Sequence, residues 1–372
     1  MTNASPDQQD LYKKAVSDVL KKLEGRDPSL HKLWEETRQL CLDDFDRLYK
    51  DLGVSFDELF FESQLEKPGK AMVKKLLKKN IAKMSEGAVV IDLKEDGLGV
   101  FLLLKSDGTA LYATKDLALA AEKFKKYKIT KSVYVVGSEQ KLYFQQLFKT
   151  LEHMGFKHAK DCTHVPFELV NLEGGKISSR EGDLISAEEL IAMLKKEALE
   201  GVISRHADWT KEEQEEAAHQ ISMGALKYTF LTQDNNRSIL FDKKKALDFE
   251  GDSGPYIQYA HARICSILRK EAADESKKRL LSQLLHPSEQ NLVAAPADFP
   301  LVLEKAGSDL KPNQLTMFLY GLAKSFNEFY RDCPILKGEE KVKQSRLLLI
   351  FCVKEVLSSG LALLGIPAPE KM

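Results

Sequence analysis

The sequence predicts an α/β domain followed by an all-α region. Short β-type runs begin at residue 88, where they replace the helical spacing of the apolar residues before them. Strand-like runs and helical stretches of roughly 12–15 residues then alternate as far as residue 170, which is typical of a parallel, doubly wound sheet. From Ser186 onward nearly the whole sequence has a helical pattern, which predicts a bundle.

The first 87 residues are expected to be mainly helical. Leu11, Val19 and Leu33 belong to sets of apolar residues at helical spacing, and a break at 25–28 divides residues 8–50 into two helices. A further helix is expected at 68–84. It is rich in lysine, which favours either a solvated helix face or a contact with a phosphate backbone.

The central part of the chain is expected to hold the strands. Two β-type runs at 88–93 and 99–104 flank the turn Glu95-Asp-Gly97 and predict a hairpin. The elements expected after it are a short extended segment at 111–114, a helix at 116–127, a strand at 132–136, a helix at 140–155 and a strand at 163–170.

The region after residue 185 is expected to be helical throughout. Ser186-x-x-Glu189 and Thr210-x-x-Glu213 are capping boxes, which start helices. Helices are expected at 187–199, 211–231, 254–274, 278–285, 312–332 and 341–363. The expected joints between them are marked by Pro287, Pro296, Pro300 and Lys337-Gly338.

The composition is that of a globular protein, with 43% hydrophobic and 30% charged residues. The formal net charge of -1 argues against a non-specific nucleic-acid binder, and no apolar stretch approaches the ~20 residues of a membrane span. The five cysteines are scattered and the eight histidines show no HExxH or HxH spacing. We therefore expect no disulfide, no metal site and a cytoplasmic location.

Three polar loops follow predicted strands, where α/β sheets place ligands. In the first, Asp116 is expected at a helix start, either as an N-cap or as a functional carboxylate. In the second, Ser138 is a candidate cap and Gln140 either a solvated or a binding residue. Together with Tyr112, these groups suit a polar, cationic small molecule.

The third loop, Gly174 to Asp183, reads GGKISSREGD. Its glycines permit unusual backbone angles, and Lys176, Ser178, Ser179 and Arg180 supply hydrogen-bond donors ahead of a helix. The spacing GxxxxGK[ST] is absent, so the residues alone leave both a phosphate site and a solvated loop open.

At this point the sequence resembles the arginyl-tRNA synthetases, from about residue 8 to the end. LYATKDLALA with YVVGSEQKLYFQQLFKTLEHMGF resembles the second half of their Rossmann-like catalytic domain. GGKISSREGDLI resembles their version of the Lys-Met-Ser-Lys-Ser signature loop, with Ser179 at the second lysine. GDSGPYIQYAHARICSIL, LAKSFNEFYRDCPIL and LALLGIPAPEKM resemble their helical anticodon-binding domain.

The resemblance implies ATP-dependent activation of L-arginine to arginyl-adenylate, with Mg²⁺, and transfer to tRNA(Arg). Tyr112, Asp116 and Gln140 fall at arginine-binding positions, although Glu139 stands where many members have a second glutamine. The implied ATP-binding residues are Gly175, Lys176 and Ser178, and the implied catalytic residues are Lys176, Ser178, Ser179 and Arg180. The implied tRNA-binding residues are Tyr256, Tyr259, Arg263, Tyr330 and Met372. Helix packing is the alternative role for Tyr256 and Tyr259.

The resemblance also implies a division of the chain into four parts. These are a connective-insertion remnant at 1–87, the second half of the catalytic domain at 88–185 with the signature loop 174–183, a helical stem-contact region at 186–245 and a DALR-type anticodon-binding domain at 246–372.

The family's His-x-Gly-His stretch is absent from the sequence. We expect the chain to be a truncated portion that is inactive alone. Two alternatives stay open. The chain is one half of a split enzyme that needs a partner chain with the N-terminal catalytic half, or it is a retained, non-catalytic tRNA-binding module.

Overall fold

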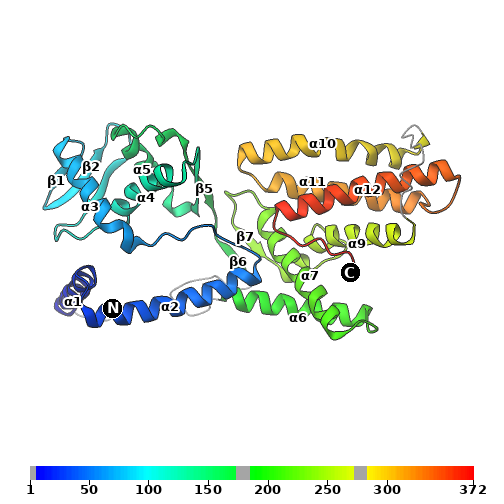
Figure 1. The fold of residues 1–372 in the computed structure, drawn as a ribbon, viewed down its shortest axis with the longest axis horizontal. Helices are drawn as coiled ribbons and strands as arrows, with labels where there is room; N and C mark the ends of the chain where they lie inside the picture. The colour runs from blue at the N-terminus through cyan, green and yellow to red at the C-terminus, as the bar shows by residue number, and fades with distance from the viewer. Residues whose placement is uncertain (1–5, 173–184, 272–282) are drawn as a thin grey trace. The chain divides into compact units, whose positions relative to one another are not determined.

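The computed structural model of the 372-residue chain describes residues 6–172, 185–271 and 283–372 (Figure 1). The chain forms two compact units, Met1–Pro166 and Phe167–Met372. Within the described helices, no segment has the length and apolar character to cross a bilayer.

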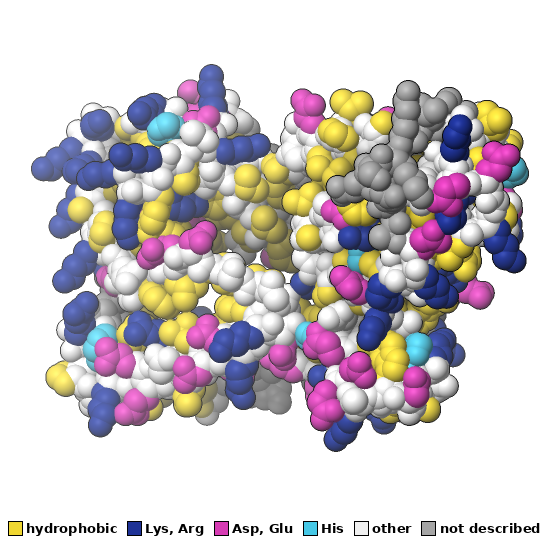
Figure 2. All heavy atoms as spheres, turned by 45° about the vertical axis from the view of Figure 1, so that its right-hand side comes forward, with side chains coloured by type: hydrophobic (Ala, Val, Ile, Leu, Met, Phe, Trp, Pro, Cys, Tyr) yellow, Lys and Arg dark blue, Asp and Glu magenta, His cyan; other side chains and the backbone are white. Residues whose placement is uncertain are grey.

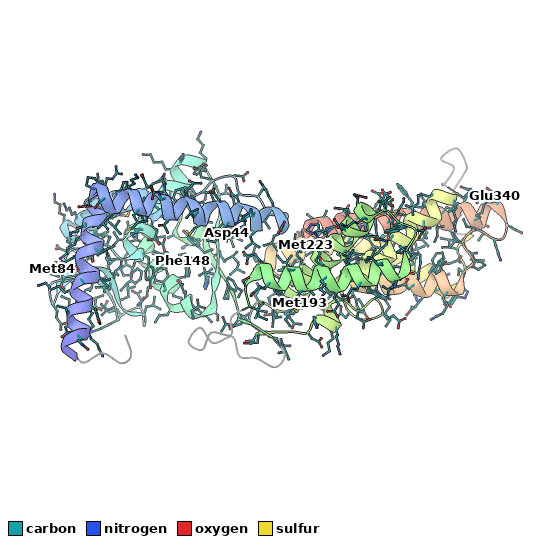
Figure 3. All side chains as sticks on the ribbon, turned by 90° about the horizontal axis from the view of Figure 1, so that it is seen from below. Asp44, Met84, Phe148, Met193, Met223 and Glu340 are labelled. Carbon is teal, nitrogen blue, oxygen red and sulfur yellow. The ribbon has the colours of Figure 1, made fainter. Side chains whose placement is uncertain are left out.

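The first unit begins with two helices, α1 (Pro6–Glu24) and α2 (Pro28–Asp51), which confirms the predicted break (Figure 3). Asp27 caps α2 by accepting hydrogen bonds from the backbone amides of Ser29 and Leu30, and Pro28 occupies the first turn, where it suits a helix. Among its described residues, α2 has none that is buried. Its apolar stripe therefore faces outward, with Leu33 60% and Leu40 71% exposed.

The lysine-rich helix α3 (Glu62–Lys78) begins earlier than predicted and ends before strand β1 (Lys83–Ser85). It buries Leu65, Val73 and Leu76, so its lysines lie on the outer side, where Lys and Arg side chains are numerous on the first unit (Figure 2). Gly69 lies against α4 so closely that a Cβ there would come within 2.5 Å of the Thr114 carbonyl oxygen.

Strands β1, β2 (Ala88–Leu93) and β3 (Gly99–Leu104) form an antiparallel sheet, which confirms the predicted hairpin. Helix α4 runs Tyr112–Tyr127, so the prediction of an extended segment at 111–114 was wrong. The buried Thr114 hydroxyl donates to the Leu103 carbonyl oxygen at 2.6 Å, and this tertiary contact, together with the Gly69 packing, favours a helix over the local β-type pattern.

Strand β4 (Ser132–Gly137) leads through the 3-10 turn η1 (Ser138–Gln140) into α5 (Lys141–His153). The turn η2 (Ala159–Asp161) then precedes strand β5 (Cys162–Phe167), which is the hydrogen-bonded neighbour of β4. Gly137 stands at the N-cap of η1 without a side-chain cap bond, so the predicted Ser138 cap was wrong. The core of this unit includes the buried Leu103, Leu117 and Leu147.

The predicted strand 163–170 divides into β5 and β6 (Val170–Leu172). β6 pairs in parallel with β7 (Ile239–Phe241) inside the second unit. In the described residues, the strands of the predicted doubly wound sheet therefore form separate pairs rather than one sheet.

In its described residues, the second unit has two short strands, β6 and β7, and its other regular elements are helices. Helices α6 (Ala187–Arg205) and α7 (Lys211–Leu231) start at the two predicted capping boxes, both of which are formed. The short α8 (Lys243–Ala246) precedes α9 (Gly254–Lys270). Helices α10 (Pro287–Asp309), α11 (Asn313–Asp332) and α12 (Glu340–Leu363) complete the bundle. Its core includes the fully buried Phe326 and Phe329.

Helix α10 spans Pro287–Asp309, so the interpretation of Pro296 and Pro300 as joints was wrong. Each proline removes a backbone hydrogen bond, but α10 packs against the bundle core through Leu292, Val293 and Phe299, and this burial offsets the loss. The predicted helix 278–285 falls largely outside the described residues.

Helices α7 and α9 cross at Gly224 and Gly254. A Cβ on Gly254 would lie 2.2 Å from the Gly224 carbonyl oxygen, a backbone atom that has no room to move. We expect Gly254→Ala to lower the free energy of unfolding by about 1–3 kcal/mol, measured by urea denaturation. Gly321→Ala in α11 is the control, because no atom lies within 4 Å of the added Cβ. Equal stability of the two variants would contradict this packing.

Candidate functional site

Asp116 lies in the second turn of α4 and not at its start, so the prediction of a helix-start carboxylate was wrong. Since α4 begins at Tyr112, Leu111 occupies the N-cap position and Asp116 does not cap the helix. The Tyr143 hydroxyl donates to Asp116 Oδ2 at 2.5 Å, and the Tyr112 ring packs on the Tyr143 ring with centroids 4.7 Å apart.

Burial raises the pKa of the Asp116 carboxyl, and the Glu62 charge raises it further, while the hydrogen bond from Tyr143 lowers it. Burial also raises the pKa of Tyr143, so this hydroxyl stays a donor. Among the described residues, no Lys or Arg forms an ion pair with Asp116. The carboxylate is thus partly desolvated and has no ion-pair partner among these residues, although the charges of Lys123 and Lys115 lower its pKa, and this suits the binding of a cationic ligand.

The other predicted residues around Asp116 are only partly brought together. Tyr112 is 53% exposed and reaches Asp116 through Tyr143, which the sequence analysis did not single out. Gln140 ends the turn η1, and in the part of the chain that the structure describes it forms no hydrogen bond with Tyr112 or Asp116. The loop residues Gly175, Lys176, Ser178, Ser179 and Arg180 lie outside the described residues.

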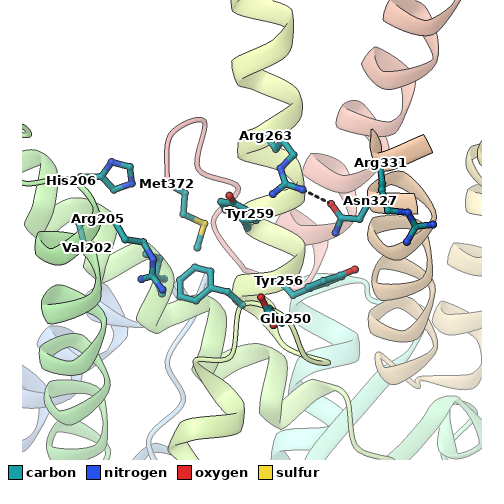
Figure 4. Close-up of a pocket in the computed structure, with 12 residues that line it drawn as sticks. Val202, Arg205, His206, Glu250, Tyr256, Tyr259, Arg263, Asn327, Arg331 and Met372 are labelled. Carbon is teal, nitrogen blue, oxygen red and sulfur yellow. Dashed lines mark hydrogen bonds between the residues drawn. The ribbon is translucent and has the colours of Figure 1, made fainter. Parts of the chain in front are cut away.

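The second unit contains a pocket of about 820 Å³ between α6, α9, α11 and the C-terminal segment (Figure 4). Four of the five residues predicted to bind tRNA line it, and Tyr330 is joined to it through Arg263. The four are Tyr256, Tyr259, Arg263 and Met372.

Three side chains hold Arg263 in this pocket. Its guanidinium carbon lies 4.5 Å from the ring centroid of Tyr259 and 4.9 Å from that of Tyr330. Its Nη1 donates to Asn327 Oδ1 at 3.0 Å, which fixes the plane of the guanidinium (Figure 4). Two aromatic faces and a hydrogen bond hold the cation while Tyr259 remains 36% exposed.

A second cation lies on the opposite wall. The guanidinium carbon of Arg205 is 4.9 Å from the Phe249 ring centroid, and Phe249 meets Tyr259 edge to face at 6.3 Å. The pocket therefore presents two adjacent rings between two cations, in the order Arg205, Phe249, Tyr259 and Arg263. Arg331 adds a third cation, and Glu250 is the one acidic side chain among the described lining residues.

The sequence analysis missed Arg205, Phe249, Asn327 and Arg331. Asn327 and Arg331 flank Tyr330 on α11, so helical spacing was a usable signal. Arg205 and Phe249 come from the end of α6 and the segment between α8 and α9, and only the tertiary fold brings them to Tyr259. For Tyr256, helix packing also holds, because its ring lies 5.3 Å from that of Tyr320.

Chemically, the pocket fits a flat ring that carries a negative charge nearby. Aromatic faces stack on unpaired nucleotide bases, and arginine guanidiniums contact both bases and phosphates. In the described residues there is no group of His, Cys, Asp and Glu side chains that could hold a metal ion. The rings and guanidiniums of the pocket are groups of the kinds that contact unpaired bases and phosphates.

Comparison with known proteins relates this geometry to a family. Residues 2–243 match the class I tRNA synthetase (R) catalytic domain, and residues 257–372 match the DALR anticodon binding domain. An arginine–tRNA ligase of Bdellovibrio bacteriovorus is 41% identical over 372 residues, covering 100% of this chain and 64% of the relative. One from Halothermothrix orenii is 36% identical over 351 residues, covering 94% and 62%.

Solved structures are similar over almost the whole chain. The arginyl-tRNA synthetase of Thermus thermophilus has a TM-score of 0.85 and 29% identity, covering 99% of this chain and 68% of that one. The Plasmodium falciparum arginyl-tRNA synthetase has a TM-score of 0.82 at 24% identity, covering 97% and 62%, and shows the fold alone. These matches confirm the predicted fold class.

The chain spans 64% of the length of the Bdellovibrio relative and 62% of the Halothermothrix relative. The catalytic-domain match alone extends over residues 2–243 of 372, well over half of the sequence. The chain therefore belongs to the class I arginyl-tRNA synthetases, with catalytic-domain sequence followed by a DALR anticodon-binding domain.

Proposed function

We propose that this chain acts in the ligation of arginine to tRNA(Arg), with ATP as the second substrate. In this reaction arginine and ATP form arginyl-adenylate and pyrophosphate, and the arginyl group passes to the terminal ribose of the tRNA. The observation that carries the proposal is the pocket in which Arg263 lies between Tyr259 and Tyr330. The curated relatives, which are arginine–tRNA ligases, support the same reaction.

In this proposal the pocket of the second unit binds an unpaired base of the anticodon loop. Tyr259 and Tyr256 offer ring faces, Arg263 offers a guanidinium, and Met372 adds an apolar wall. Tyr330 supports Arg263 and, being 43% exposed, presents its own ring to the RNA. Residues 246–372 then form the anticodon-binding domain, and 186–245 contacts the tRNA stem.

Asp116 binds the guanidinium of the arginine substrate in this proposal. A carboxylate accepts two parallel hydrogen bonds from a planar guanidinium, which an ammonium group does not match. Tyr143 holds one carboxylate oxygen at 2.5 Å, and the Tyr112 ring, packed on Tyr143, supplies an exposed aromatic face. Gln140 is assigned to the same substrate as a polar contact, within the catalytic segment 88–185.

The ATP phosphates, with Mg²⁺, are assigned to the signature loop 174–183. Lys176, Ser178, Ser179 and Arg180 would supply cations and hydroxyls to the phosphates, with Gly175 allowing close backbone approach. Residues 1–87 correspond to the connective insertion.

We expect the 372-residue chain by itself to show no arginine-dependent exchange of pyrophosphate into ATP. The sequence holds the signature loop but no His-x-Gly-His stretch, so the phosphates would be stabilised from one side only. The measurement is incorporation of labelled pyrophosphate into ATP. The positive arm adds a polypeptide that supplies the His-x-Gly-His half of the catalytic domain. Exchange by the pure chain would contradict this expectation, and a failure of the positive arm would count against the proposed reaction.

A further inference from the structure

The C-terminal segment after α12 is bound through its backbone. In Figure 1 this segment, drawn red, turns back from α12 past α7 and α9. Gln258 Nε2 donates to the Pro367 carbonyl oxygen at 2.9 Å, and His261 Nδ1 donates to that of Pro369 at 2.9 Å. Lys227 donates to the Gly365 carbonyl oxygen and Arg269 to that of Glu370.

Two of these donors, Gln258 and His261, are buried side chains of α9. Gln258 is 0% exposed and His261 is 3% exposed, so neither side chain has access to water. The carbonyl oxygens of Pro367 and Pro369 accept the hydrogen bonds that water would accept at the surface. The pKa of His261 is lowered by burial, which keeps the ring neutral, and its Nδ1 proton points to Pro369. Nε2 then accepts from the thiol of Cys265, whose sulfur lies 3.8 Å away.

This attachment ends where the pocket begins. Three residues after Pro369, Met372 lines the 820 Å³ pocket beside Tyr259 (Figure 4). Met372 also packs with Trp209 against the buried Ala217 and Val202 of the α6–α7 pair. Neither Gln258 nor His261 is among the residues that line the pocket. Their hydrogen bonds to Pro367 and Pro369 connect them to the pocket through the C-terminal segment.

We propose that Gln258 and His261 are positioning residues for RNA binding: they hold the backbone of Pro367 and Pro369 so that Met372 closes the pocket. This inference rests on the proposed anticodon-binding role of that pocket. Because both donors bond to backbone carbonyl oxygens, the attachment depends on the backbone path of the C-terminal segment and not on its side chains. In this proposal Met372 supplies the contact to the RNA.

Two substitutions of His261 test whether its hydrogen-bond donor or only the volume of its side chain is needed. His261→Asn keeps an N–H donor near the place of Nδ1, whereas His261→Leu keeps a similar volume and has no donor. We expect His261→Leu to raise the Kd for a tRNA(Arg) transcript about threefold to tenfold, and His261→Asn to stay within about twofold of the parent. Gln258→Glu removes the donor at the second position together with the bond from Gln258 to the Gln220 carbonyl oxygen, and it is also expected to raise the Kd.

A spectroscopic readout follows the segment itself, without RNA. The chain has two tryptophans, so Trp34→Phe leaves Trp209 as the single reporter beside Glu370, Lys371 and Met372. In this background His261→Leu is expected to increase quenching of Trp209 by acrylamide, and His261→Asn is not. If the wild-type chain binds no tRNA, the proposed function fails. If it binds and quenching rises without any change in Kd, the inference alone fails.

A double-mutant cycle with Met372→Ala decides whether the effect passes through Met372. If it does, His261→Leu adds less than about twofold to the Kd of the Met372→Ala chain. Full additivity of the two substitutions would overturn the positioning role, because His261 would then act on RNA binding by a separate route. Far-UV circular dichroism and the thermal midpoint of each variant establish that the compared chains are folded.

Discussion

Asp116→Asn is expected to raise the KM for arginine by about 30-fold to several thousand-fold in an aminoacylating preparation, one that combines this chain with the His-x-Gly-His half. Loss of one partner of a desolvated, hydrogen-bonded charge pair costs about 2–5 kcal/mol, since the substrate guanidinium would be left without its carboxylate. The Tyr143 hydrogen bond survives, because an amide oxygen still accepts it at the place of Oδ2. The measurement is the arginine dependence of aminoacylation.

The same substitution is expected to stabilise the chain at neutral pH. Burial raises the pKa of Asp116 in the folded protein above its ordinary value of 3.8. Between these two pKa values the folded state binds more protons than the unfolded state, so the stability contributed by Asp116 falls as pH rises through this window and is lowest above it. Asp116→Asn has no such titration, and its thermal midpoint at pH 7 should exceed that of the parent.

The control is Asp46→Asn on the exposed side of α2, which removes the same charge from a solvated position. It should alter neither the arginine KM nor the unfolding midpoint by a measurable amount. A destabilised Asp116→Asn chain with an unchanged arginine KM would show that Asp116 is a structural residue of α4 and α5.

Arg263→Ala is expected to raise the Kd for tRNA(Arg) by about 5-fold to 150-fold. Removing a stacking or cation–π partner of a nucleic-acid base costs about 1–3 kcal/mol. The substitution also frees Asn327 and leaves Tyr259 and Tyr330 without the guanidinium between them, so the whole pocket loses its arrangement. Fluorescence anisotropy with an end-labelled transcript at fixed ionic strength gives the Kd.

Arg47→Ala is the matched control, since it removes one positive charge from an exposed position of α2. A general electrostatic effect would weaken RNA binding equally in both variants and would reduce the salt dependence in both. The proposal requires that Arg263→Ala weaken binding much more than Arg47→Ala does.

The sequence predicted those elements whose signals are local. Both capping boxes begin helices at Ser186 and Thr210, and the turn Glu95-Asp-Gly97 joins two antiparallel strands. The start of α4 was missed because Thr114 bonds to Leu103 on β3, a contact that no local pattern records. Helix α10 was missed because its packing offsets two prolines that locally favour a break.

The residues of the candidate sites also divide into those that the sequence predicted and those that only the tertiary fold brings together. Tyr256, Tyr259 and Arg263 were named through the family resemblance, and the structure places all three on α9, where they line one pocket. Arg205 and Phe249 lie far from them in the sequence, and only the packing of α6 and of the segment before α9 completes the row of rings and cations. Tyr143 was missed for the same reason, since it reaches Asp116 from α5.

The most direct measurement is the affinity of the chain for two tRNA(Arg) transcripts, one intact and one with the bases of the anticodon removed as abasic nucleotides. The phosphates remain in both, so only base contacts differ. We predict that the intact transcript binds the wild-type chain at least about tenfold more tightly, and that Arg263→Ala abolishes most of this difference. Equal affinity of the wild-type chain for both transcripts would contradict the assignment of the Tyr259–Arg263 pocket to the anticodon.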